Sequence, residues 1–388
     1  MKKIFSFKKN VVLFGFVSLL NDISSDIIIP LLPLFLKNVL SASFAFIGVI
    51  EGIAESTASI LKLVSGWLSD RLRHRKPFVV AGYLIANVTR PFIALATKPW
   101  HVLTVRFLDR TGKGIRTSAR DVLIAESCDI QERGKAFGFQ RAMDNAGAVI
   151  GPLLASGLLY LFLNNYRKVF WFAVIPGIMA VILALFVQEK KQIVCQEKPF
   201  RLSLKDFDAR FKKFLLIVFI FTLGNSSDAF LILRSQDAGL IPLTIPLLWA
   251  VHNAVKSLAS MPGGMLSDRL GRKKIIIAGW TVYAAIYAGF AFCTSAWQVW
   301  ALFIGYGLYY GLTEGTERAL VADLVPPELR GSAYGMYYFA LGIGLFPASL
   351  ILGFLWQKFG PAMAFGTGAG LSLLAAVMMT VLIKENRD

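Results

Sequence analysis

Residues 66–76 read Gly-Trp-Leu-Ser-Asp-Arg-Leu-Arg-His-Arg-Lys, and residues 264–274 read Gly-Met-Leu-Ser-Asp-Arg-Leu-Gly-Arg-Lys-Lys. The shared Ser-Asp-Arg-Leu starts at Ser69 and again at Ser267, 198 residues later. Each stretch follows a long apolar run and ends in clustered positive charge. One four-residue match carries little weight, so its meaning depends on further repeats at the same distance.

Two further motifs repeat at nearly the same offset. Arg-Gly-x-Ala-aromatic-Gly occupies residues 133–138 and again residues 330–335, 197 residues later. Ser-Ser-Asp occupies residues 24–26 and again residues 226–228, 202 residues later. Three matches in the same order predict that the chain consists of two copies of one structural unit.

The composition is that of an integral membrane protein. Hydrophobic residues make up 56% of the 388 residues and charged residues 17%, against about 25% charged residues in a soluble chain. This excludes a soluble enzyme with a large core, and it excludes a disordered chain. A helix needs about 20 apolar residues to cross a bilayer, so twelve helices use about 240 residues and leave only short loops.

Apolar stretches of this length recur along the whole chain. We expect membrane-spanning helices at residues 11–36, 44–68, 78–96, 99–118, 134–162, 168–188, 213–234, 243–266, 274–294, 297–322, 331–356 and 361–383. The fold class is then an all-α membrane protein of twelve helices in two pseudo-symmetric six-helix bundles, an arrangement typical of transporters. The predicted division is an N-terminal bundle at 1–188, a linker at 189–212 and a C-terminal bundle at 213–388.

Positive charge collects in the loops on one side. The formal net charge is +17, and Lys and Arg cluster in residues 2–9, 71–76, 189–212 and 269–274. Cytoplasmic loops are enriched in Lys and Arg, so this side is predicted to be cytoplasmic and the charge is no sign of nucleic acid. An even number of spans then places both termini in the cytoplasm of a cell with a bacterial-type inner membrane.

The 189–212 linker has a helical pattern of its own. Phe200, Leu204, Phe207 and Phe211 recur at helical spacing among charges. This spacing favours a short helix on the membrane surface, and a solvated linker is the alternative.

No motif indicates a cofactor or a metal site. The three cysteines, Cys128, Cys195 and Cys293, lie far apart and lack the spacing of a metal site or a disulfide framework. The Gly-Lys-Gly at residues 112–114 lacks the spacing of a phosphate loop. Because no nucleotide-binding element is present, we expect the energy for transport to come from an ion gradient, with protons as the coupling ion.

The loops at 66–76 and 264–274 resemble the signature loop of the major facilitator superfamily, which lies between spans 2 and 3 of that family. The second copy matches more closely, because Arg73 and His74 of the first copy stand where the family usually has one Gly. Residues 109–121 are similar to a poorly characterised prokaryotic branch of the superfamily. The resemblance covers the whole chain and implies alternating access, in which two halves rock around a central site.

The resemblance also implies that the signature loops gate this movement. A carboxylate at the cytoplasmic end of a helix can pair with Arg across the loop and cap a neighbouring helix. The alternative is that the loops only anchor the topology through positive charge. The predicted gating residues are Gly66, Asp70, Arg71, Arg75, Gly264, Asp268, Arg269 and Arg272.

Span 1 carries two acids inside the membrane. Asp22 and Asp26 lie one turn apart, about 16 and 22 Å deep at about 1.5 Å per residue. A charge at the bilayer centre costs at least about 2.5–3.5 kcal/mol, so we predict a polar network across spans 1, 2, 4 and 5. The alternative is a set of purely structural ion pairs. The proton-coupling candidates are Asp22, Asp26, Glu55, Asp109, Asp144 and, where the superfamily's span-4 arginine usually falls, Arg106.

Span 4 carries a stripe of positive charge. Arg106, Arg110 and Lys113 recur at steps of three and four, which places them along one side of the helix. A cationic stripe attracts an anionic solute, so we expect these residues to line a cavity. Arg116 and Arg120, further along the helix, are expected to reach the cytoplasmic surface as topology anchors.

Other candidate contacts come from spans 5, 7 and 8. Gly147, Gly151 and Pro152 of span 5 resemble the glycine-proline motif of superfamily antiporters, and ordinary close packing is the alternative. Asn225 and Asp228 of span 7 mirror the span-1 acids. The predicted substrate-binding residues are Arg106, Arg110, Lys113, Arg141, Asn145, Asn225, Asp228, His252 and Lys256.

These features predict a secondary active transporter rather than an enzyme. We expect a monomer in the lipid bilayer that moves a small organic solute, anionic or a carboxylate, coupled to protons, with export slightly favoured. The alternatives are uptake of a ferric carboxylate siderophore or similar chelate, and efflux of lipophilic cations by proton antiport through Asp22, Asp26 and Asp228. A membrane enzyme is disfavoured because no nucleophile, base and oxyanion donor occur at suitable spacing. A non-transporting sensor is disfavoured because the gating loop is repeated.

Overall fold

The computed structural model describes residues 3–4, 7–72, 74–129, 132–189, 204, 207–326 and 329–383, with the backbone alone for 3–4, 7 and 66–72. A short antiparallel pair of strands, β1 (Lys3–Ile4) and β2 (Phe7–Lys8), precedes the helices. The helical elements of the first half are α1 (Lys9–Ile28), α2 (Leu32–Leu34), η1 (Phe35–Val39), α3 (Phe44–Leu72), α4 (Lys76–Thr89), η2 (Arg90–Leu95), α5 (Pro99–Glu126), α6 (Arg133–Leu161), α7 (Tyr166–Phe172) and α8 (Val174–Leu185). Those of the second half are α9 (Ala209–Gly224), α10 (Asp228–Asp237), α11 (Ile245–Leu270), α12 (Arg272–Phe292), α13 (Ala296–Asp323), α14 (Arg330–Phe359) and α15 (Pro361–Leu382).

Each of the twelve predicted spans coincides with one long helix or with consecutive shorter ones. Among the described residues, nine helical runs are long and apolar enough to cross a membrane. The other three predicted spans are α5, α11 and α13, in which charged, polar, glycine or tyrosine residues interrupt the apolar ones. The least apolar spans therefore include the two, α5 and α11, that hold most of the predicted substrate-binding cations.

Proline interrupts two of the spans that were predicted to be continuous. The first span stops being a regular helix at Ile28 and continues through α2 and the π-helical η1, because Pro30 and Pro33 cannot donate helix hydrogen bonds. The third span changes from α4 to the 3-10 helix η2 at Arg90, next to Pro91. The second change places the Arg90 side chain at the end of a regular helix.

Span 7 is interrupted without a proline. α9 ends at Gly224 and α10 begins at Asp228, and the intervening Asn225 has a non-helical ψ of 82°. The Ser227 hydroxyl accepts a hydrogen bond from the backbone N–H of Ala229 at 3.2 Å and so caps α10. The prediction of one continuous helix at 213–234 is therefore wrong in its middle.

The chain separates into two compact units. The first unit consists of Met1–Leu40, Thr57–Phe200 and Pro242–Ala250, and the second of Ser41–Ser56, Arg201–Ile241 and Val251–Asp388. The first part of α3 thus belongs to the second unit, and the first part of α11 belongs to the first unit. The division into bundles at 1–188 and 213–388 with a linker at 189–212 stays a prediction.

Most of the predicted linker, including Phe200, lies outside the described residues. Of the other positions of the predicted surface helix, Leu204 and Phe207 lie in bends, and Phe211 lies in α9. α9 starts with a capping contact, in which Asp208 accepts a hydrogen bond from the Phe211 N–H at 2.8 Å. The described part of the linker is therefore non-helical up to this cap.

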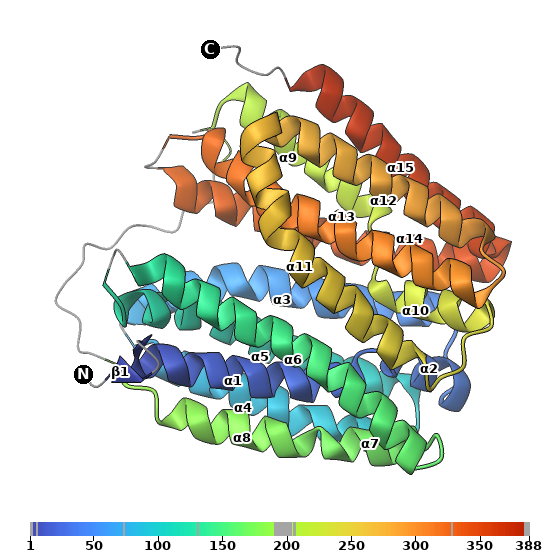
Figure 1. Ribbon diagram of the computed structural model, residues 1–388, viewed down its shortest axis with the longest axis horizontal. Coiled ribbons are helices and arrows are strands. Elements are labelled where there is room, and N and C mark those ends of the chain that lie inside the picture. The colour runs from blue at the N-terminus through green and yellow to red at the C-terminus, as the bar shows by residue number, and fades with distance from the viewer. Residues whose placement is uncertain are drawn as a thin grey trace. The chain divides into compact units, whose positions relative to one another are not determined.

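In the first unit, α1 packs mainly on α6 and α8, and α4 packs on α5 (Figure 1). Small residues allow these close approaches. A Cβ atom at Gly147 of α6 would lie 2.7 Å from the carbonyl oxygen of Leu19 in α1. A Cβ atom at Gly112 of α5 would lie 2.5 Å from the carbonyl oxygen of Gly82 in α4. The glycines of spans 4 and 5 thus have a packing role in this unit.

In the second unit, α12 packs on α13 and α15, and α9 packs on α14 and α15. Its core is aromatic, with Trp280, Tyr283, Tyr287 and Tyr306 among its fully buried side chains. These four side chains come from α12 and α13. Three of them carry a hydroxyl group, so the core of this unit contains hydrogen-bonding groups as well as apolar surface.

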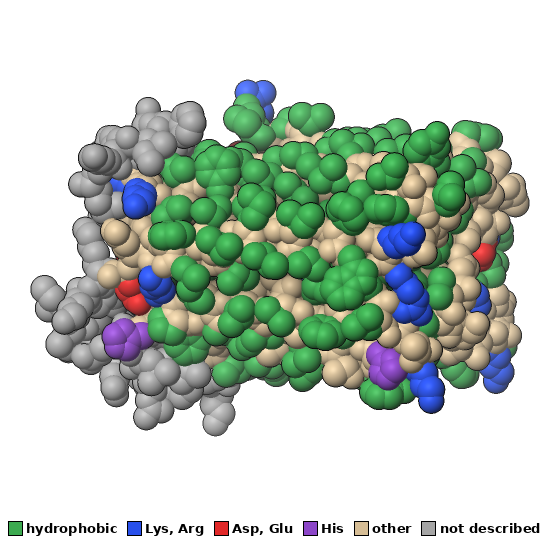
Figure 2. All heavy atoms as spheres, turned by 90° about the horizontal axis from the view of Figure 1, so that it is seen from below, with side chains coloured by type: hydrophobic (Ala, Val, Ile, Leu, Met, Phe, Trp, Pro, Cys, Tyr) green, Lys and Arg blue, Asp and Glu red, His purple; other side chains and the backbone are tan. Residues whose placement is uncertain are grey.

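Hydrophobic side chains cover the middle of the face shown in Figure 2, and Lys and Arg side chains lie mostly toward its ends. In α8, Ile175, Ile178, Ile182 and Leu185 are all about half exposed. Apolar side chains that are exposed over a whole helix face are typical of a surface in contact with lipid.

Candidate functional site

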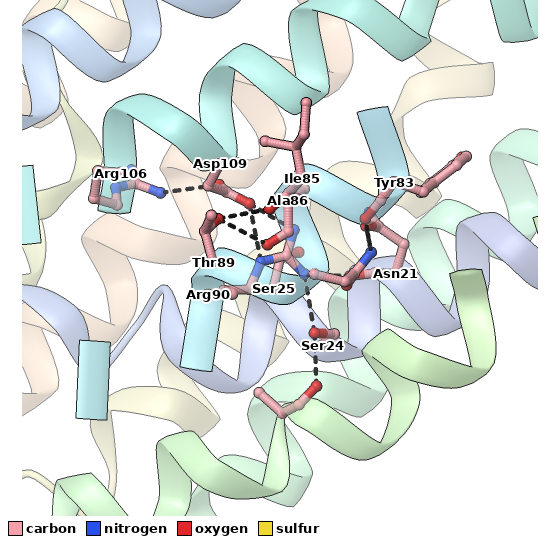
Figure 3. A network of polar contacts seen from close by, with 12 residues as sticks. Asn21, Ser24, Ser25, Tyr83, Ile85, Ala86, Thr89, Arg90, Arg106 and Asp109 are labelled. Atoms are coloured by element: carbon pink, nitrogen blue, oxygen red, sulfur yellow. Dashed lines mark hydrogen bonds and ion pairs between the residues drawn. The ribbon is translucent and has the colours of Figure 1, made fainter. Parts of the chain in front are cut away.

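A buried ion pair lies at the centre of the first unit. Arg90 lies where α4 changes to η2, and Asp109 lies on α5. The Nε and Nη2 atoms of Arg90 both donate to Asp109 Oδ1, at 3.0 and 2.8 Å (Figure 3). Both side chains are less than one-tenth exposed. Burial of this pair removes two charges from water, so each needs further partners.

The remaining guanidinium nitrogen of Arg90 finds its partners on α1 and α4. Nη1 donates to Ser24 Oγ at 2.9 Å, to Asn87 Oδ1 at 3.1 Å and to the Asn21 carbonyl at 3.3 Å. The Ser24 hydroxyl in turn donates to the carbonyl of Ala173, between α7 and α8, at 2.8 Å. Figure 3 shows Arg90 between Asp109 on one side and Ser24 on the other. The network therefore joins four of the predicted spans.

The position of this network corrects the sequence prediction. We expected a polar network across spans 1, 2, 4 and 5, but Arg90 of span 3 is its centre. Arg106 contributes weakly, with Nη1 3.9 Å from Asp109 Oδ2. The span-2 acids Glu51 and Glu55 belong to the second unit, where Glu51 accepts a hydrogen bond from Ser227 Oγ at 3.5 Å.

A second polar group joins α1 to α6. The side-chain amide of Gln140 donates to Asp144 Oδ2 at 2.6 Å and to Ser18 Oγ at 3.0 Å. Asp22, one turn along α1, accepts from the Asn21 side chain at 2.9 Å and interacts electrostatically with Asp144. The two acids Asp22 and Asp144, both predicted as proton-coupling candidates, therefore lie near each other within one unit.

Asp26 is held by neutral donors. It is 8% exposed, and its Oδ1 atom accepts from the indole Nε1 of Trp249 at 3.1 Å. Its Oδ2 atom accepts from Ser25 Oγ at 3.2 Å. Trp249 lies in the Pro242–Ala250 segment, which belongs to the same unit as Asp26. A carboxyl group bound by neutral donors can gain or lose a proton without breaking an ion pair.

The cationic stripe of α5 is only partly accessible. Arg106 and Arg110 are 5% and 8% exposed. That these two arginines line a cavity stays a prediction. Lys113, in contrast, is exposed although it lies in the middle of the helix. Arg141 of α6 is also exposed, and Asn145 is half-buried. The accessible cations of this unit's site are therefore Lys113 and Arg141.

The prediction that Arg116 is a surface anchor is wrong. Arg116 is 6% exposed, and its guanidinium carbon lies 4.4 Å from the centre of the Tyr83 ring. Arg120 is partly buried, and it donates to Asp121 Oδ1 through Nε and Nη2, each at 3.0 Å. Arg120 Nη1 also donates to Ser18 Oγ at 3.4 Å. Both arginines therefore point into the unit, because α5 keeps the same interior side along most of its length.

The break in span 7 organises the polar groups of the second unit. Asp228 is the first residue of α10, and it accepts from the Tyr306 hydroxyl at 2.6 Å. Asn225, in the break itself, accepts from the Tyr283 hydroxyl at 3.2 Å. The same hydroxyl donates to the carbonyl of Gly224, the last residue of α9, at 3.1 Å. The break thus leaves the Gly224 carbonyl and the side chains of Asn225 and Asp228 free of helix hydrogen bonds, and tyrosines of α12 and α13 donate hydrogen bonds to them.

The two predicted contacts on α11 lie against the same tyrosines. The His252 ring stacks on Tyr306 with centroids 5.1 Å apart. Lys256 Nζ lies 4.2 Å from the centre of the Tyr310 ring and pairs with Glu314 Oε2 at 3.1 Å. The second unit therefore brings Asn225, Asp228, His252 and Lys256 together around a tyrosine cluster.

The two signature loops form equivalent ion pairs. Arg272 Nε pairs with Asp323 Oδ2, at the end of α13, at 2.6 Å. Arg75 Nη1, 197 residues earlier, pairs with Glu126 Oε1, at the end of α5, also at 2.6 Å. In each copy, an arginine near the end of the loop thus pairs with an acid at the end of a later helix, α5 in the first unit and α13 in the second. Gly271 has a positive φ of 93°, which explains the glycine of the second loop.

The other predicted gating residues are less constrained. Asp268 is exposed and lies 3.7 Å from Arg272 Nη2, and Arg269 is exposed as well. A Cβ atom at Gly264 would meet nothing within 4 Å. The side chains of Asp70 and Arg71 lie outside the described part of the chain, and of Gly66 only the backbone position in α3 is described.

Next to the first loop, a distant carboxylate caps α4. Glu189 accepts from the backbone N–H of Arg75 at 2.6 Å and from that of Lys76 at 3.1 Å. A negative charge at a helix N-terminus is favourable, so this contact ties the start of the linker to the loop. Near the end of α5, the hydrogen bond from Lys8 Nζ to Asp129 Oδ1, at 2.7 Å, raises the pKa of Lys8.

The buried acid Glu317 is absent from the predicted site residues. Glu317 of α13 is 7% exposed and accepts from Trp280 Nε1 at 2.9 Å and from the Tyr337 hydroxyl at 2.7 Å. Like Asp26, it is held by an indole and a hydroxyl group. The available signal was an acid within span 10, but its aromatic partners lie on two other helices and no spacing links them.

The sequence model of the Major Facilitator Superfamily matches residues 14–232 and residues 214–388, which together cover nearly the whole chain. The chain belongs to the Major Facilitator Superfamily. It is therefore a multi-pass membrane protein and a secondary transporter of small molecules, not an enzyme. The predicted family, the twelve-helix fold class and the transporter class are confirmed.

Relatives agree with this assignment over most of their length. An uncharacterised MFS-type transporter of Methanocaldococcus jannaschii is 37% identical over 96% of this chain and 94% of its own. The multidrug resistance protein MdtH of Proteus mirabilis is 25% identical over 82% of this chain and 80% of its own. The cis,cis-muconate transport protein of Acinetobacter baylyi is 22% identical over 97% and 94%.

A solved structure shows the same fold. The crystal structure of the nucleoside transporter NupG superposes with a TM-score of 0.78, covering 97% of this chain and 100% of that one. Because only 16% of the residues are identical, the likeness extends to the fold alone.

Proposed function

We propose that this MFS transporter carries a small organic anion with a carboxylate group, coupled to protons. The observation that carries the proposal is the charge of α5. This helix holds five cations, Arg106, Arg110, Lys113, Arg116 and Arg120, against the three carboxylates Asp109, Asp121 and Glu126. A membrane-spanning helix with such an excess is unfavourable unless negative charge comes to it. A transported anion supplies that charge.

The accessible cations are the proposed contacts in the first unit. Lys113 and Arg141 are exposed, and Asn145 is half-buried on the same helix as Arg141. Arg106 and Arg110 are buried, so we assign them the supporting role of making the potential positive. The muconate transporter, whose named solute is a dicarboxylate, is one relative that supports a carboxylate substrate.

In the second unit, the residues around the tyrosine cluster are the proposed contacts for the rest of the solute. Asn225, Asp228, His252 and Lys256 contribute amide, acid, imidazole and amine groups beside aromatic rings. Such a surface suits an unsaturated or aromatic body with polar substituents. Their use by the substrate is part of the proposal.

For proton coupling, we propose Asp22, Asp26 and Asp144 ahead of Asp109. Asp109 accepts two hydrogen bonds from Arg90, and protonation would weaken that buried pair. Asp26 has neutral donors, and Asp144 repels Asp22 electrostatically, so a proton on Asp22 would relieve that repulsion. Glu55 and Arg106 stay weaker candidates for this role.

The remaining details extend this proposal. We propose an inner-membrane location, both termini in the cytoplasm, a functional monomer and gating by the repeated loops. We also propose export as the physiological direction. Uptake of a ferric carboxylate siderophore stays an alternative within the class of anionic solutes.

The test is binding followed by flux. Purified protein would be titrated with succinate, cis,cis-muconate and the neutral dimethyl ester of muconate, and flux would then be measured in proteoliposomes with and without a pH gradient. Lys113→Gln and Arg141→Gln should weaken binding of the anions by about tenfold, as expected for loss of a charge-assisted hydrogen bond. Lys135→Gln, an exposed lysine near the start of α6, is the matched control.

A second function is favoured by one observation in the second unit. Asp228 lies beside the rings of Tyr306, Tyr310 and Tyr283, and an acid among aromatic rings is suited to an organic cation. The likeness to the multidrug resistance protein MdtH supports the same alternative. Binding of tetraphenylphosphonium that is lost in Asp228→Asn, without binding of either carboxylate, would favour cation efflux over the anion proposal.

A further inference from the structure

Arg116 and Tyr83 form a buried pair inside the first unit. Arg116 of α5 is 6% exposed and Tyr83 of α4 is fully buried. The guanidinium carbon lies 4.4 Å from the centre of the Tyr83 ring, so one face of the cation is covered by the ring. The two helices meet closely here, since a Cβ atom at Gly82 would lie 2.6 Å from Arg116 Cβ. The pair is therefore held in place by backbone packing.

Each member of this pair has a buried polar atom without a partner. Within the described part of the chain, no group forms a hydrogen bond with Arg116 Nη1 or with the Tyr83 hydroxyl, and both atoms are shielded from solvent. Leaving one such buried group unsatisfied costs about 1–3 kcal/mol. Two buried donors without partners on side chains that contact each other, one of them cationic, are suited to binding an anionic oxygen.

The nearby carboxylates do not fill this site. Asp109 and Asp22 attract Arg116 electrostatically, while Arg90 repels it. Asp109 is bound by Arg90, and Asp22 accepts from the Asn21 side chain. Among the residues that the structure describes, no acid lies within ion-pair distance of Arg116. Its charge is therefore compensated only from further away.

Lys113 connects this site to an accessible surface. Lys113 precedes Arg116 by three residues on α5, so the two side chains lie on neighbouring positions of one helix side. Lys113 is exposed, and both cations interact electrostatically with Asp22. Lys113 thus places an accessible positive charge about one helical turn from Arg116.

We propose that Arg116 and the Tyr83 hydroxyl form the terminal binding site for the carboxylate of the transported solute. The planar guanidinium would bind both oxygens, and the phenol would donate to one of them. Lys113 is the first contact and Arg116 the final one. This inference rests on the proposed function in taking the solute to be an anion, and it adds the residues that select for a carboxylate.

The experiment uses the full-length protein in detergent, with succinate and cis,cis-muconate as probes. Arg116→Gln removes the charge and should weaken binding of both probes by about tenfold or more. Arg116→Lys keeps the charge but loses the paired geometry and should lose most of the affinity. Tyr83→Phe removes one hydroxyl and should weaken binding about threefold. Arg133→Gln, an exposed arginine at the start of α6, is the control and should bind as the parent does.

A second measurement separates a binding role from a structural one. Without any anion, Arg116→Gln should melt at the parent temperature or above it, because an unsatisfied buried charge has been removed. Tyr83→Phe should likewise melt no lower. A lower melting temperature for Arg116→Gln, together with parent-like affinity for both probes, would assign the two groups to a structural water and overturn the proposal.

The outcomes distinguish this inference from the proposed function. If the parent protein binds neither carboxylate, the proposed function fails and this inference fails with it. If the parent binds them and Lys113→Gln weakens binding, but Arg116→Lys and Tyr83→Phe do not, only the present inference is overturned. Tyr83→Phe and Arg116→Lys are small changes, so they decide the question even where Arg116→Gln does not fold.

Discussion

The two copies of Ser-Ser-Asp adopt different structures in the two units. In the first copy, residues 24–26 lie inside the continuous helix α1, which runs on to Ile28. In the second copy, residues 226–228 lie at the break between α9 and α10, and Asp228 starts a new helix. The same three residues therefore allow both conformations, and their surroundings decide between them.

The neighbouring residues explain the difference. Ser25 Oγ donates to the carbonyl of Asp22 at 3.2 Å, a bond that a serine can form within a helix. Ser227 Oγ instead accepts from the backbone N–H of Ala229, as a helix cap does. The second copy is preceded by Gly224, where a Cβ atom would lie 2.7 Å from the carbonyl oxygen of Gly368. The close contact of α9 with α15 thus requires glycine at the point where the helix ends.

The partners of the repeated acid differ as well. Asp26 accepts from an indole and a serine, whereas Asp228 accepts from the hydroxyl of Tyr306. The polar network of the first unit is centred on the buried guanidinium of Arg90, and that of the second unit contains the hydroxyl groups of tyrosines. The two copies therefore share the acid but differ in the groups that surround it.

Arg90→Ala tests the network of the first unit and should have the largest effect. It leaves Asp109 buried without its main partner, which should destabilise the protein by about 3–5 kcal/mol. In the second unit, Tyr306→Phe removes one donor from Asp228 and should cost about 1–3 kcal/mol. Thermal unfolding in detergent would measure both changes.

The control for these variants is Arg133→Ala, at an exposed position, which should change stability by less than about 0.5 kcal/mol. The double variant Arg90→Ala/Asp109→Ala should recover part of the loss, because the unpaired carboxylate is gone. An Arg90→Ala protein as stable as the parent would show that the network has no structural role.

Gly147 and Gly344 lie 197 residues apart. Alanine at each position tests how tightly the helices pack within that residue's own unit. A Cβ atom at Gly147 would lie 2.7 Å from the backbone oxygen of Leu19, so Gly147→Ala should cost about 1–3 kcal/mol. At Gly344 the nearest atom is the side-chain Cγ2 of Thr222, at 2.8 Å, which can move, so the loss should be smaller.

Gly157→Ala is the matched control in the same helix as Gly147. A Cβ atom at Gly157 would meet nothing within 4 Å, so alanine should be neutral or stabilise by up to about 1 kcal/mol through helix propensity. Equal losses of stability for Gly147→Ala and Gly344→Ala would contradict the claim that the backbone contact at Gly147 is less able to adjust than the side-chain contact at Gly344.

The sequence predicted the fold closely, because hydropathy reports directly on the bilayer. Eleven of the predicted spans begin within three residues of the observed helical run, and the remaining span, at 213, begins four residues late. The repeats identified the duplicated unit, and the signature loops identified the family. These features are local, so one sequence is enough to find them.

The site was predicted only in part, because contacts between helices are not local. Arg116 was expected at the surface from its position along α5, yet it points toward Tyr83 of α4. The role of Arg90 at the centre of the network depends on partners from three other elements, which its position in the sequence does not indicate. The break at Asn225 lies next to the close contact between Gly224 and α15, which no spacing reveals.

Asp26→Asn and Asp228→Asn separate the proposed roles of the two acids. Asparagine keeps the shape and the hydrogen-bond acceptor but cannot carry a proton. Asp26→Asn should therefore reduce transport driven by a pH gradient at least about tenfold, equivalent to about 1.4 kcal/mol, while solute exchange without a gradient persists. Asp228→Asn should instead weaken solute binding and leave the response to the pH gradient in place. The reverse pattern, measured in proteoliposomes, would exchange the two assignments.

Ser227→Ala and Ser25→Ala test the opening comparison itself and should have the smallest effects. Ser227→Ala removes the cap of α10 and should destabilise that helix by about 1 kcal/mol. Ser25→Ala removes a bond within a continuous helix, where alanine is the better helix former, and should change stability by only a few tenths, about 0.3 kcal/mol. Hydrogen exchange should show faster exchange for the first amides of α10 in Ser227→Ala, and no change along α1 in Ser25→Ala. Unchanged protection at Ala229 in Ser227→Ala would mean that the break is maintained by the contact at Gly224 alone, without help from the cap.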